Sequence, residues 1–265
     1  MINENLHKKA VALDRMKHRG LKLNLASRDL SAVRRLNAFF VAGTEFTDAC
    51  KEYPVVWVNA GKSDDGKVMV APIAVFGLQS EQNLCISDDK WRVRYVPAML
   101  RLYPFALARV ADNQMVVCMD ESWTGFNNTL GEALFNDQGE PTDFTLNVQK
   151  QLENFEQEVE RSRLAGALLV EKGLLRDMRF DATMPDGTKL TVDGFLTIDE
   201  EKLGALSDAD VLEFHRNGLM GLIHAHQISL ANMAKLVEWH IERMPAAAAN
   251  APTVAKAANA ANGAA

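Results

Sequence analysis

Residues 91–108 read WRVRYVPAMLRLYPFALA, and this stretch determines the expected fold. It begins with large apolar side chains alternating with mostly basic ones, the period of two that predicts a strand with one face on a core. Pro97 cannot donate to a sheet, so the strand should end there. The next residues, 99–103, are expected to form a short helical turn that Pro104 closes. Because a second strand should begin at Phe105, we expect 91–108 to form the middle of a sheet.

The segments on either side of this stretch predict further strands. Upstream, the apolar runs 55–58 and 68–78 flank a turn that contains Asp-Asp-Gly, the pattern of a hairpin. A shorter apolar run covers 84–86. Downstream, 105–110 and 115–119 are separated by an Asp-Asn turn. About six closely spaced strands joined by short turns indicate one antiparallel sheet.

The second half of the chain predicts helices with one hairpin among them. Thr145 or Asn147 is expected to cap a long helix that runs to about Lys172. A hairpin over 178–198 follows, because its two apolar runs flank a Pro-Asp-Gly turn. A helical hairpin should then begin near Asp199.

The last part of this helical hairpin is expected to contain two helices. Ser207 is expected to cap the first, 208–216. The second should run as one final helix over 219–243.

These elements together predict an α+β fold. An antiparallel sheet from the N-terminal half should pack with a long helix, a hairpin and a C-terminal helical hairpin. We expect a basic arm over 1–20 and one α+β domain over 21–244. The domain should be strand-rich over 21–145 and helix-rich over 146–244, where hairpin 178–198 lies. An Ala-rich tail over 245–265 should be disordered.

Charge is distributed unevenly along the chain. The net charge of −6 argues against nucleic acid as a partner. Residues 1–35 nevertheless contain nine Lys or Arg against three Asp or Glu, so the remainder carries −12. We therefore expect the basic arm to lie on the acidic body of its own chain rather than on an acidic partner.

Neither a membrane span nor a secretory signal is evident in the sequence. No apolar run approaches the length of about 18 residues that a transmembrane helix needs, and the N-terminal residues lack an uninterrupted apolar segment. We expect a cytoplasmic protein, although export by a route that uses no N-terminal signal stays open. The three cysteines are far apart, which favours reduced thiols over disulfides or zinc ligands: Cys50, Cys85 and Cys118.

Four histidines near the C-terminus raise the question of a metal site: His215, His224, His226 and His240. Side chains two residues apart on a helix diverge by about 200°, so His224 and His226 should not share one ion. We expect core histidines satisfied by hydrogen bonds and no metal. No phosphate-binding loop, dinucleotide fingerprint or nucleophile motif is present, so we expect no cofactor and assign no catalytic residue.

Two groups of residues remain as candidates for a ligand site. Arginines in and beside the central stretch have the chemistry to bind an anion, although pairing with the protein's own acids is the alternative. The cluster Asp-Glu-Ser-Trp at 120–123 follows a strand, where two carboxylates either face a ligand or solvate the strand end. The candidate ligand-binding residues are Arg94, Arg101, Tyr103, Asp120 and Trp123.

The order of several motifs is similar to that of the SapC-like family of bacterial proteins over roughly residues 15–240. The block Arg-x-Tyr-Pro-Phe at 101–105 is the most specific of these motifs. The others are Glu45-Phe46, Tyr53-Pro54-Val55-Val56-Trp57, Val96-Pro97-Ala98, Leu134-Phe135 with Gly139, Gly194-Phe195 with Asp199 and Leu203, and Gly218-Leu219 with His224-Ala225-His226 to Leu230.

The resemblance implies a context rather than a reaction. The family takes its name from an association with bacterial surface layers, and its members also occur near genes for flavin-dependent halogenases and outer-membrane receptors. The leading hypothesis is a non-enzymatic binding or assembly protein, with a protein partner or a homo-oligomer. The alternative is an enzyme or accessory protein that acts on a small acidic or peptide-like ligand, in a cleft lined by the candidate residues.

Overall fold

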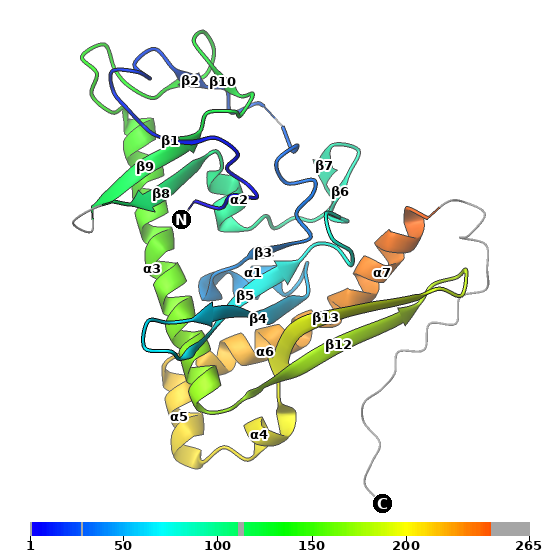
Figure 1. The fold of residues 1–265 in the computed structure, drawn as a ribbon. Helices are drawn as coiled ribbons and strands as arrows, with labels where there is room; N and C mark the ends of the chain where they lie inside the picture. The colour runs from blue at the N-terminus through cyan, green and yellow to red at the C-terminus, as the bar shows by residue number, and fades with distance from the viewer. Residues whose placement is uncertain (1, 28, 111–113, 245–265) are drawn as a thin grey trace, which may run out of the picture.

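The computed structural model describes residues 2–27, 29–110 and 114–244, and Figure 1 shows its fold. Helices and antiparallel strands are both abundant, so the α+β prediction is confirmed. No helix within these stretches is long and apolar enough to span a bilayer. The tail at 245–265, predicted to be disordered, lies outside the described residues.

The largest sheet is built from two hairpins and one short strand. Its antiparallel order is β12-β13-β4-β5-β3. Both hairpins were predicted, and the two hairpins meet where Leu196 pairs with Trp57. The strands are β3 (Ala38–Phe40), β4 (Val55–Lys62), β5 (Val68–Val75), β12 (Leu175–Thr183) and β13 (Lys189–Ile198).

The remaining strands form three smaller sheets, so the expectation of one sheet from the N-terminal half was wrong. The first has the order β1-β9-β8 and the second β10-β2-β11, while β6 and β7 form a two-stranded sheet. The long-range pairing of β1 with β9 replaces the single meander that the close spacing of the strands suggested. These strands are β1 (Ala10–Ala12), β2 (Lys22–Leu23), β6 (Ile86–Ser87), β7 (Lys90–Trp91), β8 (Phe105–Arg109), β9 (Met115–Asp120), β10 (Phe126–Asn127) and β11 (Glu132–Ala133).

The central stretch is only partly as predicted. The short helix α2 (Ala98–Leu102) and strand β8 are confirmed, but the strand expected over 91–96 ends at Trp91. Beyond it, side chains bind the main chain: the Tyr53 hydroxyl donates to the carbonyl of Tyr95, and the Glu52 carboxylate accepts the N–H of Arg94. Because side chains already satisfy these groups, the segment needs no neighbouring strand.

The buried apolar side chains of the described residues form two clusters, which we call the larger and the smaller core. In Figure 1, β8 and β9 of the smaller core lie above β4 and β5 of the larger one. The larger core lies around the five-stranded sheet, and its bulkiest members include Phe46, Tyr53, Trp57, Phe76 and Phe214. The smaller core lies against β8 and β9. It consists of Leu23, Phe105, Leu107, Met119, Leu134, Phe135, Val148 and Leu152.

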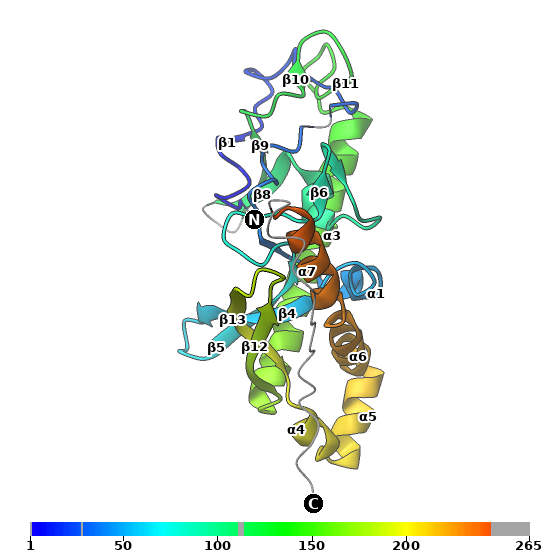
Figure 2. The same ribbon diagram turned by 90° about the vertical axis from the view of Figure 1, so that its right-hand side faces the viewer.

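The long helix α3 (Asp143–Glu171) connects the two cores. Its first turns contribute Val148 and Leu152 to the smaller core, and its later turns contribute Phe155 and Leu169 to the larger one. Figure 2 shows the resulting elongated body, with β10 at one end and α4 and α5 at the other. The helix is capped by Thr142, a few residues before the predicted Thr145 or Asn147. Thr142 accepts the N–H of Thr145, so Thr145 already lies in the first turn.

The C-terminal helices are α4 (Glu200–Gly204), α5 (Asp208–Arg216), α6 (Leu219–Ser229) and α7 (Asn232–Glu242). Ser207 caps α5 as predicted. The single helix predicted over 219–243 was wrong, because it breaks between Ser229 and Asn232. Both flanking side chains bind the chain at or just before the start of β4: Ser229 accepts the N–H of Val55, and Asn232 donates to the carbonyls of Cys50 and Tyr53. These anchors hold the two helices in different directions.

Candidate functional site

Asp120 lies at the centre of a hydrogen-bonded cluster at the end of β9. Its carboxylate is fully buried and accepts hydrogen bonds from the Tyr103 hydroxyl at 2.9 Å and the Ser122 hydroxyl at 2.6 Å. It also accepts the main-chain N–H groups of Ser122, Lys8 and Lys9 at 3.0–3.1 Å. The carboxylate therefore fixes the N-terminal arm to the body of the chain.

The electrostatics of this cluster also favour a structural role. Burial alone would raise the pKa of Asp120, but hydrogen bonds from Ser122, Tyr103 and Lys9 together lower it below the ordinary value. Burial and the adjacent carboxylate of Asp120 raise the pKa of Tyr103. The acid stays charged and the phenol stays protonated, so neither group is prepared to exchange a proton near neutral pH.

The arm and the body also pair through surface charges. The side chains of Lys9 and Lys17 both lie 2.8 Å from the carboxylate of Glu121. The basic arm thus contacts acids of its own chain, as its charge predicted. Trp123 completes this region by packing its ring against Tyr103 at 6.4 Å and Phe126 at 5.5 Å. Three of the five predicted ligand-binding residues, Tyr103, Asp120 and Trp123, are therefore together, but in a packed cluster.

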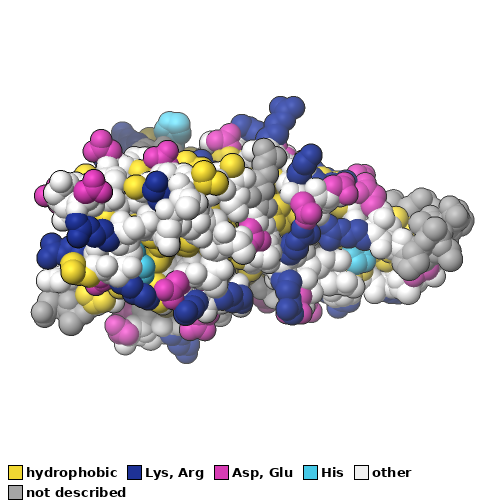
Figure 3. Space-filling view, turned by 90° about the horizontal axis from the view of Figure 1, so that it is seen from above, with side chains coloured by type: hydrophobic (Ala, Val, Ile, Leu, Met, Phe, Trp, Pro, Cys, Tyr) yellow, Lys and Arg dark blue, Asp and Glu magenta, His cyan; other side chains and the backbone are white. Residues whose placement is uncertain are grey.

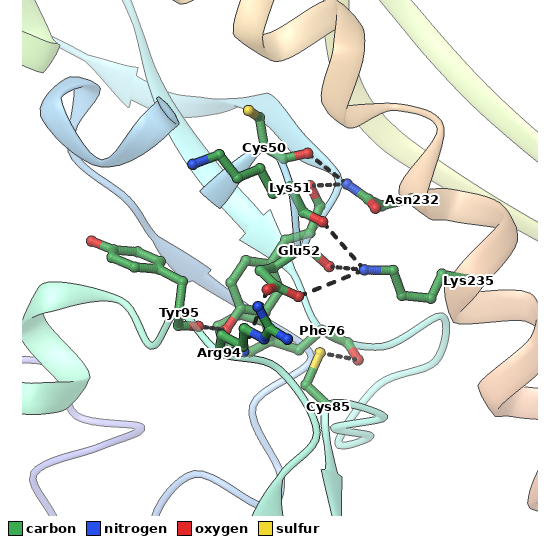
Figure 4. A network of polar contacts seen from close by, with 10 residues as sticks. Cys50, Lys51, Glu52, Phe76, Cys85, Arg94, Tyr95, Asn232 and Lys235 are labelled. Carbon is green, nitrogen blue, oxygen red and sulfur yellow. Dashed lines mark hydrogen bonds and ion pairs between the residues drawn. The ribbon is translucent and has the colours of Figure 1, made fainter. Parts of the chain in front are cut away.

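Arg94 lies in a different place. It is exposed, its main-chain N–H contacts Glu52, and Figure 4 shows it beside the network that joins Lys235 of α7 to Lys51 and Glu52. Among the described residues, no hydrogen bond or ion pair links Arg94 to the Asp120 cluster. Another arginine, Arg109, shows the alternative expected for the arginines in and beside the central stretch, pairing with an acid of the same chain. Its guanidinium lies 3.8 Å from the carboxylate of Glu156.

A second buried carboxylate, Glu45, holds the segment that follows Arg94. The 3₁₀ turn η1 (Gly43–Glu45) leads into the short helix α1 (Phe46–Ala49) and places Glu45 against α2. The carboxylate accepts the Tyr95 hydroxyl at 2.7 Å, the N–H of Ala98 at 2.7 Å and the N–H of Ala42 at 2.8 Å. Burial and this carboxylate raise the pKa of Tyr95. Glu45 and Tyr95 together form part of the wall of a pocket.

This polar pocket lies between η1, α2 and α3 and has a volume of about 360 Å³. Arg101 lies over the Tyr95 ring at 5.5 Å. The side chains of Thr44, Gln151 and Asn154 are exposed, and neither they nor Arg101 form a hydrogen bond or ion pair within the described chain. The lining residues are Thr44, Glu45, Tyr95, Ala98, Arg101, Leu102, Gln151, Asn154, Phe155 and Glu158.

An apolar pocket of about 390 Å³ adjoins the polar one and shares Thr44 and Glu158 with it. Most of their lining residues come from η1, α2, α3 and the start of α6, and we call the two pockets together the α3 groove. Glu158 pairs with Arg161 at 2.6 Å. The lining of the apolar pocket is Gly43, Thr44, Glu158, Arg161, Ser162, Leu164, Ala165, Leu168, Asn217, Gly218, Leu219 and Leu222.

Gly43 allows η1 to lie close to both neighbouring helices. Its N–H donates to the Ser162 hydroxyl of α3 at 2.8 Å. A Cβ at this position would lie 3.1 Å from a methyl carbon of Leu222, closer than nearly all such contacts in proteins. A small residue here therefore brings Thr44 to the boundary between the two pockets.

Sequence reasoning identified only one residue of this groove as a ligand contact, Arg101. Glu45 was considered only as part of a family motif. Gln151 and Asn154 share a face of α3 because they are three residues apart, next to the buried Leu152 and Phe155. The local sequence signal for this site is a pair of polar amides beside an apolar stripe. Such amides are common on helices, so the signal is too unspecific to predict a site.

His226 is a core histidine, as predicted. Its Nε2 accepts the N–H of Ile198 at 3.3 Å and the Thr197 hydroxyl at 2.9 Å, while Nδ1 donates to the carbonyl of Val55 at 2.7 Å. Burial lowers its pKa to about 4, so the ring is neutral at physiological pH. His224 is exposed instead, and the described residues contain no group of three or more metal-binding side chains.

All three cysteines are free, and burial makes two of them less reactive. It raises the pKa of Cys85 to about 12 and also raises the pKa of Cys118 above its ordinary value. A thiol with so high a pKa is a poor nucleophile.

These features define an α+β protein with a two-part groove along its longest helix. A family model described as SapC matches residues 13–236, and the chain belongs to the SapC family. The resemblance in the sequence is thereby confirmed. No curated protein and no solved structure matches the chain significantly.

Proposed function

We propose that this SapC-family chain is a non-enzymatic binding or assembly protein that holds its ligand in the α3 groove. One observation carries the proposal. Both carboxylates that line the groove already have internal partners: Glu45 accepts three hydrogen bonds, and Glu158 pairs with Arg161. The side chains left without such partners, including Arg101, are suited to recognition rather than to acid–base chemistry.

The family context suggests where such binding is used. An association with bacterial surface layers or other envelope processes fits a protein that holds an assembly partner, either another protein or a second copy of itself. A cytoplasmic setting is part of this proposal. Figure 3 supports a partner other than nucleic acid, because basic and acidic side chains are interspersed over the face it shows.

An enzyme or accessory protein that acts on a small acidic or peptide-like ligand is the second candidate. It is favoured by Arg101, whose guanidinium lies unpaired at a pocket large enough for a small ligand. The two candidates differ in what happens to a bound ligand. A binding protein returns it unchanged, whereas an enzyme changes its mass.

Native mass spectrometry of the purified protein tests the proposal. We expect a bound species that Arg101→Gln loses and Arg94→Gln retains. Arg94 is the matched control, because it is also an exposed arginine of the central stretch but lines neither pocket. A protein that retains nothing, or loses its ligand equally in both variants, would contradict the proposed site. A ligand whose mass changes on incubation with the protein would favour the enzyme.

A further inference from the structure

We propose that the α3 groove binds an extended peptide segment of a protein partner, one that carries a carboxylate and an apolar side chain four residues apart. This inference rests on the proposed binding function and adds the chemistry of the ligand. It depends on three features of the groove: a cation and two amides whose side chains have no hydrogen-bond or ion-pair partner among the described residues, and an adjoining apolar pocket.

The carboxylate end is assigned by Arg101. Its guanidinium packs over the Tyr95 ring, which holds it at the polar pocket, and no acid of the described chain neutralises it. A planar guanidinium suits a carboxylate better than other common groups of a peptide. The two acids of the lining already have partners: Glu158 pairs with Arg161, and Glu45 accepts hydrogen bonds from neutral donors.

The amides favour a peptide over an acyl chain. Gln151 and Asn154 each offer a donor and an acceptor to the same pocket, the combination that pairs with a main-chain peptide group. An acyl chain would leave these amides without hydrogen-bond partners. Its methylene groups would also cover the ion pair Glu158–Arg161 where the two pockets adjoin, which removes charged groups from water without compensation. A peptide can place main-chain polar groups at both positions.

The apolar end is assigned by the second pocket. Leu164 has 52% of its surface exposed, although it lies next to Leu168, Leu219 and Leu222 in the pocket lining. A volume of about 390 Å³ is ample for one leucine-sized side chain. Covering these leucines would remove apolar surface from water, so this pocket would contribute affinity while Arg101 contributes selectivity.

The separation of the two pockets along α3 sets the spacing between the two anchors of the peptide, the carboxylate and the apolar side chain. Asn154 in the polar pocket and Ser162 in the apolar pocket are eight residues apart on α3, a distance of ~12 Å at 1.5 Å per residue. An extended chain covers this distance in about four residues. Residues four apart in an extended chain also point to the same side, so both anchors would face the groove.

Titration of the ¹⁵N-labelled full chain with acetyl-Leu-Gly-Ser-Gly-Asp-amide tests the inference by NMR. The comparison peptides replace Asp with Asn, or Leu with Ala. We expect the Asp peptide to bind about tenfold more tightly than the Asn peptide, the effect of one charge-assisted contact. The side-chain amide signals of Gln151 and Asn154 should shift, and the Ala peptide should bind several-fold more weakly.

Variants of the protein separate the two anchors. Arg101→Gln should abolish the preference for Asp over Asn, while Leu164→Ala should weaken both leucine peptides. Arg94→Gln should change neither. Equal binding of the Asp and Asn peptides by the native chain, or a preference that persists in Arg101→Gln, would overturn the inference.

The outcome also distinguishes this inference from the proposed function. If the protein ignores all three peptides but still retains a native ligand that Arg101→Gln loses, the peptide assignment is wrong and the binding function stands. If it binds no peptide and retains no ligand, both proposals are wrong.

Discussion

The larger and the smaller core differ in what holds their long-range strand pairs. In the larger core, β4 pairs with β5 and β12 with β13 across short turns, and the two hairpins meet where Leu196 pairs with Trp57 inside the packed core. In the smaller core, β8 pairs with β9 locally, but β1 reaches β9 from far away, and the bond from the N–H of Lys8 to Asp120 joins residues 112 positions apart. Apolar packing therefore joins the two hairpins of the larger core, whereas polar contacts to one carboxylate close the smaller core.

This difference has an energetic meaning. Local hairpins close with little loss of chain entropy, whereas a distant strand has to be held by specific contacts at its destination. The smaller core provides such contacts through the five hydrogen bonds to Asp120, while the larger core depends on volume and packing. Substitutions in the two regions should therefore differ in both size and reach.

The largest expected effect is on Trp57 in the larger core. Its side chain is 1% exposed, and its ring centroid lies 6.1 Å from that of Phe46. Trp57→Ala should lower the free energy of unfolding by about 3–5 kcal/mol, since a large cavity would remain. Because α3 contributes to both cores, we expect a single unfolding transition in urea. Hydrogen exchange of the amides in β4 and in β9 measures whether the two cores unfold together.

A matched variant separates packing from hydrogen bonding at this position. The Nε1 donor of Trp57 has no hydrogen-bond partner in the described structure. Trp57→Phe removes this buried donor and keeps an aromatic ring, so it should cost clearly less than Trp57→Ala. Two separate transitions would show that the cores are not coupled, and equal costs for the two variants would show that the lost packing of the ring does not determine the effect.

The same difference explains which parts of the fold the sequence predicts. The hairpin 178–198 was identified because Asp-Gly marks a tight turn, and the structure gives Gly187 the positive φ, 84°, that such a turn requires. The short helix before Pro104 and the long helix were also identified from neighbouring residues. The pairing of Ala10–Ala12 with β9 has no local signal, because it depends on contacts made by Asp120.

The candidate site was less predictable than the fold for a related reason. Its side chains come from η1, α2 and α3, and no motif spacing connects three separate segments. Arg101 was identified because guanidinium groups in and beside the central stretch have the chemistry to bind an anion, whereas Thr44 and Gln151 resemble ordinary surface residues. The break after Ser229 was missed for the same reason, since it depends on bonds to Val55, far away in the chain.

A somewhat smaller effect is expected from the pH dependence of the larger core. The pKa of His226 is lowered to about 4 by burial, whereas an unfolded histidine has an ordinary value near 6.5. The neutral ring therefore favours the folded state above pH 6.5, and this contribution is lost as the pH falls from 6.5 towards 4. The difference in pKa corresponds to about 3 kcal/mol of unfolding free energy.

Urea unfolding at several pH values between 7 and 4.5 measures this contribution. His226→Gln should flatten the pH dependence, because Gln does not titrate. The control is His224→Gln, two residues away and exposed, which should leave the pH dependence unchanged. A profile equally steep in His226→Gln would assign the titration to other groups, including His7 and His18 of the arm, whose pKa values burial also lowers.

The smallest of these effects, and the most local, should come from Asp120 in the smaller core. Asp120→Asn retains one acceptor oxygen but replaces the other with an amide that faces donors such as the N–H of Lys8 and the Tyr103 hydroxyl. We expect a loss of about 2 kcal/mol, in the range for hydrogen bonds to a charged group. Amide exchange at 10–12 should accelerate while exchange in β4 stays unchanged, because only the arm loses its anchor.

Glu121→Gln is the matched control: its ion pairs with Lys9 and Lys17 are exposed, and such pairs contribute about 0–1 kcal/mol. If Glu121→Gln released the arm as strongly as Asp120→Asn, surface charge rather than the buried carboxylate would close the smaller core.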